Sequence, residues 1–185
     1  GALREALSIL GPAAVKNPKN AETRMFQAFA ELKYGQALAA NGDTMGAAAA
    51  WNKALTASET LLETGQQSPT VSYISACRYL GEAAAVKGDA VRAEQYAARI
   101  RDAADPKGTF GKVRTAEIQI QMTPLANGAR GFIALRLGHK DQARDLLSQS
   151  AAEWQAAAAK LPLSAPMEYE RKQVEEQLAS RGGSR

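Results

Sequence analysis

The chain of 185 residues is long enough to bury a core of its own, and its length favours one domain or two small ones. Hydrophobic residues make up 45% and charged residues 23%, which excludes a disordered or fibrous protein, and the formal net charge is +4. Alanine, the best helix former and a poor strand former, occurs 39 times, whereas aromatic residues make up only 6%. One cysteine and one histidine exclude a disulfide framework and a structural zinc site. The sequence therefore predicts an all-α fold.

The first predicted element is a helix over residues 2–10. Gly11 and Pro12 are expected to stop it, because proline cannot donate the next backbone hydrogen bond. This helix belongs to a lead-in over residues 1–19. Three helical hairpins are predicted within residues 20–162, and their approximate bounds are 21–64, 68–105 and 112–161.

Serine and proline residues mark the later boundaries. In the second hairpin Ser68 is expected to cap the first helix, and Pro69 to take its first position. In the third hairpin Pro124 is expected to kink or restart the leading helix. The C-terminal segment, residues 163–185, is predicted to form a charged capping helix over about 167–179, and its last residues are expected to fray.

One spacing of glycine and alanine occurs three times. In each copy a glycine is followed seven residues later by a second glycine, and five residues after that by an alanine. Two additional copies of one such spacing are about a 2% event by chance, so the pattern indicates an internal repeat. The copies are Gly35, Gly42 and Ala47, then Gly81, Gly88 and Ala93, then Gly131, Gly138 and Ala143.

Each position of the repeat has a structural interpretation. The first glycine lies within a helix, where it costs about 1 kcal/mol relative to alanine, so a neighbouring helix is expected to pack too closely for a β-carbon. The repeated alanine, in the second helix, is expected to pack against this glycine. The second glycine is expected to end the first helix in the left-handed conformation. Asp43 and Asp89 then cap the next helix, and Asp141 complements the N-terminus of the third.

This pattern resembles the tetratricopeptide repeat, a helical hairpin that stacks into a right-handed solenoid, over roughly residues 21–158. The copies are 46 and 50 residues apart rather than the 34 of the standard unit, so the helices or the links between them must be longer. The resemblance implies a concave groove lined by the first helix of each hairpin. The residues assigned to this groove are Lys33, Gln36, Arg78, Glu82, Phe132 and Arg136.

Arg78 and Glu82 are central among these groove residues. They are four residues apart and so share a helix face, and they belong to the middle repeat. They are expected to lie in the deepest part of the groove, where they either orient a partner or form an exposed ion pair.

Residues 51–62 and the C-terminal sequence are similar to the alanine-rich repeats appended to bacterial serine/threonine protein kinases of the acidobacterial type. The last repeat of that group ends with an arginine-rich helix, a tryptophan segment, a Leu/Pro stretch and a terminal helix, which Arg144, Trp154, residues 161–163 and residues 170–178 match. The chain contains no kinase motif: no glycine-rich loop, no His-Arg-Asp and no Asp-Phe-Gly. The resemblance implies a sensor, substrate-recruiting or oligomerising tail.

Few residues are candidates for catalysis. His139 is interpreted as a solvated turn residue, and Cys77 as a small buried hydrophobic side chain. The carboxylates of Glu168 and Glu170 are interpreted as part of a solvated helix face, because apolar surroundings that would raise their pKa are not evident. No catalytic, metal-binding or cofactor-binding residue is assigned, and no cofactor is expected.

The sequence supports three functional hypotheses. The first is a non-catalytic module that binds a peptide or helix of a partner protein in the groove. The alternative is the regulatory, oligomerising or substrate-recruiting tail of a protein kinase, which self-association of the chain at micromolar concentration would favour. The third is a basic helical repeat that binds nucleic acid, which the scattered lysines and arginines disfavour. No stretch is long and apolar enough to predict a membrane segment.

Overall fold

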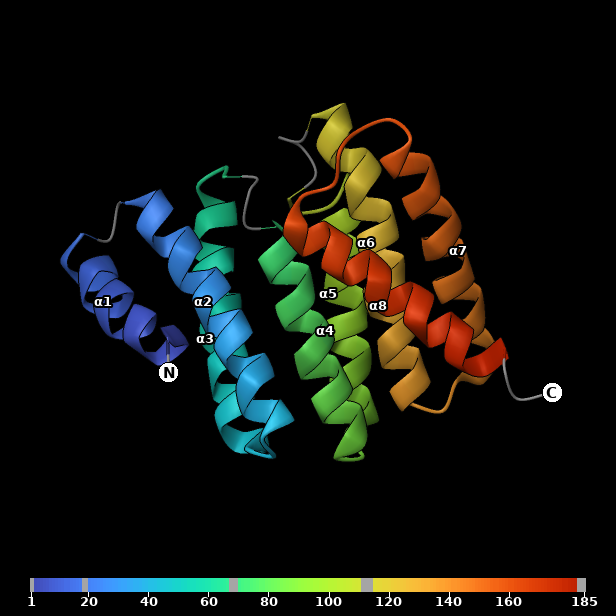
Figure 1. Ribbon diagram of the computed structural model, residues 1–185, viewed down its shortest axis with the longest axis horizontal. Helices are drawn as coiled ribbons and strands as arrows, with labels where there is room; N and C mark the ends of the chain where they lie inside the picture. Colours follow the sequence, from blue (N-terminus) through green and yellow to red (C-terminus); the bar gives the residue numbers. More distant parts are fainter. Residues whose placement is uncertain (1, 18–19, 67–69, 111–114, 183–185) are drawn as a thin grey trace.

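The computed structural model describes residues 2–17, 20–66, 70–110 and 115–182, which form helices joined by turns and contain no strand (Figure 1). The fold is all-α, as the alanine-rich composition predicts. Helices α2 to α7 form the three predicted hairpins, and α8 follows them. The helices are α1 (Ala2–Lys16), α2 (Ala21–Ala40), α3 (Thr44–Glu63), α4 (Thr70–Val86), α5 (Ala90–Ala104), α6 (Ala116–Arg136), α7 (Lys140–Ala158) and α8 (Ala165–Gly182).

The three hairpin turns share one conformation. Gly42, Gly88 and Gly138 have φ values of 83°, 80° and 81°, in the left-handed region that glycine adopts without a steric penalty. The side chains of Asp43 and Asp89 each accept a hydrogen bond from the backbone N–H three residues later, and they cap α3 and α5. The predicted turns and both predicted caps are confirmed.

The first glycine of each repeat lies where two helices meet. A β-carbon at Gly35 would lie 2.4 Å from Nε1 of Trp51 in α3, and one at Gly131 would lie 2.8 Å from Cγ of Leu147 in α7. One at Gly81 would lie 2.5 Å from a side-chain carbon of α6, in the next hairpin. The alanines of the repeat have no exposed surface. The close helix packing predicted at the first glycine is confirmed, but the nearest side chains are Trp51, Ile133 and Leu147 rather than the repeated alanines.

The first helix is longer than predicted. α1 continues through Gly11 and Pro12, so the expected stop at these residues is wrong. Proline removes one backbone hydrogen bond, but the bonds beyond it can still form, and the N–H of Asn17 donates to the carbonyl of Ala13 at 2.9 Å. The last turns of α1 also bury Ala14, and α1 packs against α2. This packing compensates for the missing bond.

The third hairpin begins later than predicted. Thr115 is the extended N-cap residue of α6, and its hydroxyl accepts a hydrogen bond from the backbone N–H of Ile118. The helix therefore begins after Thr115 rather than at residue 112. Residues 111–114 lie outside the described residues, as do Ser68 and Pro69 with the cap predicted there.

Pro124 lies inside α6, which does not restart there as expected. The proline is fully buried, and the hydroxyl of Ser150 in α7 donates to its carbonyl at 2.7 Å. Packing against α7 thus holds the helix together across the position where proline cannot donate a backbone hydrogen bond. The same contact gives the hydroxyl of Ser150, which is fully buried, its hydrogen-bond partner.

Helix α8 is the element that the repeat does not describe. α4 packs against both α2 and α6, and α8 crosses the face that these three helices share, with its first turns beside α4 and its last turns beside α7 (Figure 1). The predicted C-terminal helix is confirmed, and its bounds, Ala165–Gly182, are wider than the expected 167–179. Residues 183–185, in the tail expected to fray, lie outside the described residues.

Candidate functional site

The groove residues predicted from the repeat lie on the face that α2, α4 and α6 share, which we call the groove face. Arg78 Nε lies 2.8 Å from Glu82 Oε1 in α4, and Arg136 Nε of α6 lies 3.2 Å from Glu82 Oε2. The guanidinium of Arg78 lies over the ring of Phe132, also in α6, at 3.6 Å from the ring centroid. The structure therefore joins four of the six residues in one cluster.

The other two groove residues lie on α2 and face the same way. Gln36 donates a hydrogen bond from its amide to the hydroxyl of Tyr79 in α4. The ammonium group of Lys33 lies 4.2 Å from the ring centroid of Tyr169 in α8. Burial lowers the pKa of Lys33, and the nearby carboxylate of Glu170 opposes this shift. Both side chains therefore contribute contacts between helices.

Arg78 is held from the other side by α8. Its Nη1 lies 2.6 Å from Oε2 of Glu170, whose second oxygen accepts a hydrogen bond from the hydroxyl of Ser75 at 2.8 Å. Burial by itself disfavours the charged guanidinium, but the carboxylates of Glu170 and Glu82 raise the pKa of Arg78 above its ordinary value. The arginine is therefore a permanent buried cation with two carboxylate partners.

Two expectations about charge on this face are wrong. Arg78 is not part of an exposed pair, because only 4% of its surface is accessible, and Glu170 is not on a solvated face, because only 7% of its surface is accessible. The reason is the register of α8, which places Glu170 opposite Arg78. The sequence of α8 does indicate that Glu170 is buried. Met167, Val174 and Leu178 follow helical spacing, and Glu170 lies on the same face of the helix.

Apolar contacts hold α8 further along its length. Val174 packs with Phe132 and Leu147 in a small cluster of buried side chains. A β-carbon at Gly128 of α6 would lie 2.9 Å from Cγ2 of Val174, so the absence of a side chain at Gly128 lets α8 approach α6 closely. The groove face thus carries a helix of its own chain, bound by one buried ion pair and a short apolar seam.

Two clefts on the groove face remain open. The upper cleft, of about 320 Å³, lies between α2, α4 and the first turns of α8, and the lower cleft, of about 450 Å³, lies between α2, α3, α4 and α6. The upper cleft is lined by apolar side chains that include Phe26, Phe29, Leu32, Val71, Met167 and Tyr169, with Lys33 among them. The lower cleft is lined by Trp51, Tyr79 and Val86, with the charged residues Glu82, Lys87 and Arg136.

The remaining reactive side chains lie apart from these clefts. Cys77 is fully buried, as predicted, and burial raises the pKa of its thiol to about 12, so the thiolate is not formed near neutral pH. His139 is the exposed residue before α7, as predicted, and its Nδ1 lies 3.8 Å from Glu94 Oε1. The described residues contain no group of three or more His, Cys, Asp or Glu side chains placed to hold a metal ion.

Comparison with known proteins gives no relative for this chain. No family model, no curated protein and no solved structure matches it. Among the described residues, none of the helices combines the length and the apolar character that crossing a membrane requires. The geometry of the groove face is therefore the observation on which a functional proposal can rest.

Proposed function

We propose that this chain is a non-catalytic binding module of the tetratricopeptide-like type, which holds an amphipathic helix of a partner protein on the groove face beside α8. The observation that carries the proposal is α8 itself. It is a helix bound on this face through a carboxylate on Arg78 and an apolar residue against Phe132. A surface that binds one helix in this way has the chemistry to bind another alongside it.

The upper cleft supports the apolar half of this recognition. Phe26 and Phe29 are 50% and 38% exposed, and Tyr169 across the cleft is 39% exposed. Aromatic side chains grouped around an open cleft are the residues that dominate binding energy when a partner covers them. An apolar helix side chain that enters this cleft would remove all three rings from water.

Charged residues at both clefts support the polar half of the recognition. Lys33 borders the upper cleft, and Lys87 and Arg136 border the lower one, where Glu82 is already engaged by Arg78 and Arg136. The side chain of Arg136 is 55% exposed and can turn to a ligand. The partner helix is therefore expected to carry carboxylates beside its apolar residues.

The proposal can be tested without a known partner. A display library of peptides of about 20 residues, which is five to six helical turns, is panned against the full chain, and enriched sequences are synthesised and titrated. We expect enriched peptides to combine acidic and apolar residues at helical spacing. Phe29→Ala and Arg136→Ala should each weaken their binding by about tenfold, which corresponds to ~1.4 kcal/mol.

The matched control is Lys140→Ala, which removes an exposed cation at the start of α7, away from both clefts. It should leave the affinity within about twofold of the original value. Circular dichroism of each variant checks that helix content is retained. Enriched peptides that bind Phe29→Ala and Arg136→Ala as tightly as the unchanged chain would refute the assignment of the binding site to the groove face.

A further inference from the structure

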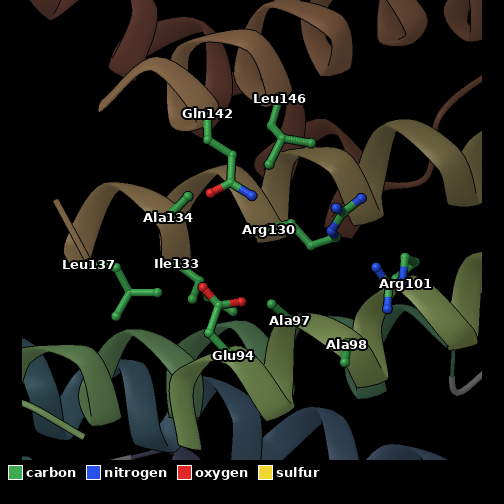
Figure 2. A pocket seen from close by; sticks show the side chains of 10 residues that line it. All are labelled: Glu94, Ala97, Ala98, Arg101, Arg130, Ile133, Ala134, Leu137, Gln142 and Leu146. Carbon is green, nitrogen blue, oxygen red and sulfur yellow. The ribbon is translucent and has the colours of Figure 1, made fainter. Parts of the chain in front are cut away.

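A further pocket, distinct from the two clefts, lies away from the groove face, between α5, α6 and α7 (Figure 2). Arg101 of α5 and Arg130 of α6 direct their guanidinium groups toward the same end of this pocket, and the amide of Gln142 in α7 extends over it. Glu94 lies further along, toward Leu137. The other lining residues are small or apolar: Ala97, Ala98, Ile133, Ala134 and Leu146.

Neither arginine forms an ion pair with a carboxylate within the described part of the chain, although the charge of Glu94 acts on Arg130. No ion pair or hydrogen bond joins either guanidinium to another described residue, and Glu94 is directed to His139 at 3.8 Å. Arg130 is about half buried, and its pKa is lowered first by this burial and then by the positive charge of Arg101, with Glu94 opposing the shift. Two positive charges at one end of a pocket favour an anion between them.

We propose that this pocket binds a compact oxyanion of the phosphate type, either free or as a phosphate monoester. Guanidinium groups present planar forks of N–H donors that match the oxygens of a tetrahedral anion, and charge-assisted bonds of this kind are the strong ones. The cavity measures about 120 Å³. This volume has room for a phosphate group and several water molecules.

Each polar residue of the pocket has a separate role in this site. Arg130 supplies the partly desolvated charge, since a half-buried guanidinium binds an anion more strongly than an exposed one. Arg101, which is exposed in the last turn of α5, closes the site from the solvent side. Gln142 can donate from its amide N–H₂ group. Glu94 repels the anion and so lowers the affinity of the pocket for it. A substitution of Glu94 tests this role.

The site can be tested by calorimetric titration of the full chain with inorganic phosphate at constant ionic strength. Constant ionic strength excludes general screening by salt as the cause of any signal. We expect saturable one-to-one binding of phosphate. Arg130→Met and Arg101→Met keep most of the apolar stem and remove the charge, and each should weaken binding by at least about tenfold. Glu94→Gln should strengthen binding, because it removes the repelling charge.

The control is Arg92→Met, which removes an exposed arginine from the first turns of α5, the helix that also carries Arg101. Arg92 lies outside the pocket. A parallel titration with phosphoserine distinguishes the two sources of phosphate: tighter binding of phosphoserine favours a phosphorylated partner, and tighter binding of inorganic phosphate favours the free ion. Saturable binding lost in Arg130→Met and kept in Arg92→Met supports the site. No saturable binding, or equal weakening in both variants, would overturn it. Neither result bears on the groove face, since this pocket shares the helix α6 with that face but has no lining residue in common with either cleft.

Discussion

Arg78 is the residue on which the groove face depends. It has a carboxylate partner in its own helix and another in α8, and it also lies over an aromatic ring of α6. A buried ion pair contributes little net stability relative to an apolar pair, but removal of one member leaves the other charge buried without a partner. Arg78 therefore specifies where α8 docks more than it strengthens the fold.

Removal of Arg78 should therefore be costly. Arg78→Met should destabilise the fold by about 3 to 5 kcal/mol, because Glu170 is left as a buried charge without its arginine. The double variant Arg78→Met with Glu170→Met should recover a large part of this loss. Free energies of unfolding from urea titration measure both effects.

The control for this prediction is in α8. Arg171 forms ion pairs with Glu168 and Glu175 at the helix surface, and these carboxylates are 38% and 42% exposed. Arg171→Met should cost less than about 1 kcal/mol, because solvent screens such pairs. If Arg78→Met proved as mild as Arg171→Met, the buried ion pair would not hold α8.

Among the helices, the first glycine of each repeat sets the distance to a neighbouring helix, which belongs to the same hairpin at Gly35 and Gly131 and to the next hairpin at Gly81. At Gly131 the obstacle to a side chain is Leu147, whose Cγ would lie 2.8 Å and whose backbone nitrogen 3.3 Å from an added β-carbon. The backbone nitrogen cannot move without shifting α7. At Gly35 the obstacle is the rigid indole of Trp51, which also stacks on Tyr79 with ring centroids 5.1 Å apart. Because Trp51 lines the lower cleft, Gly35 links the packing of the first hairpin to the shape of that cleft.

Gly131→Ala should destabilise the fold. Helix propensity alone would make alanine more stable by about 1 kcal/mol at this position. The steric conflict with Leu147 should instead produce a net loss of about 1 to 3 kcal/mol. Thermal and urea denaturation followed by circular dichroism measure the sign.

A second-site variant separates the steric cause from other causes. Leu147→Ala alone should destabilise the fold by about 2 to 5 kcal/mol through the cavity it leaves. In that background Gly131→Ala should cost much less than it does alone, because the added methyl group enters the cavity. Additive losses in the double variant would show that the two residues do not conflict.

At the scale of the whole molecule, burial is unequal along the array of helices. α4 lies in the middle and has eleven buried residues, whereas α1 lies at the N-terminal end and has one, Ala14. In a stack of helical hairpins each unit is stabilised mainly by its neighbours, so a terminal helix with one neighbour opens at lower free energy than a central one.

Amide hydrogen exchange tests this gradient. Protection factors in α1 should be lower than those in α4 by at least about a hundredfold, and those of α8 should lie between them because α8 is tied down by Glu170 and Val174. Truncation of α1 should leave the protection of α4 unchanged. Equal protection in α1 and α4 would show that the helices unfold as a single cooperative unit.

Local sequence patterns predict the features that depend on residues close together in the chain. The alanine content predicts the all-α fold, and the repeated glycines and aspartates predict three hairpins with their turns and caps. These properties follow from backbone sterics and helical periodicity, which act over a few residues. The expectation that Arg78, Glu82, Phe132 and Arg136 line one groove comes instead from the resemblance to the tetratricopeptide repeat.

The position of α8 on the groove face, and the clefts left open beside it, depend on packing between distant segments of the chain. The pairing of Arg78 with Glu170 joins residues 92 positions apart, and no local pattern specifies which cation a buried glutamate will meet. Gly11, Pro12 and Pro124 are read locally as helix breakers, yet packing against α2 and α7 carries both helices through them. At the glycine and prolines, the free energy gained by burying side chains between helices exceeds the cost of one missing backbone hydrogen bond or one unfavourable helix propensity. That burial depends on the whole fold.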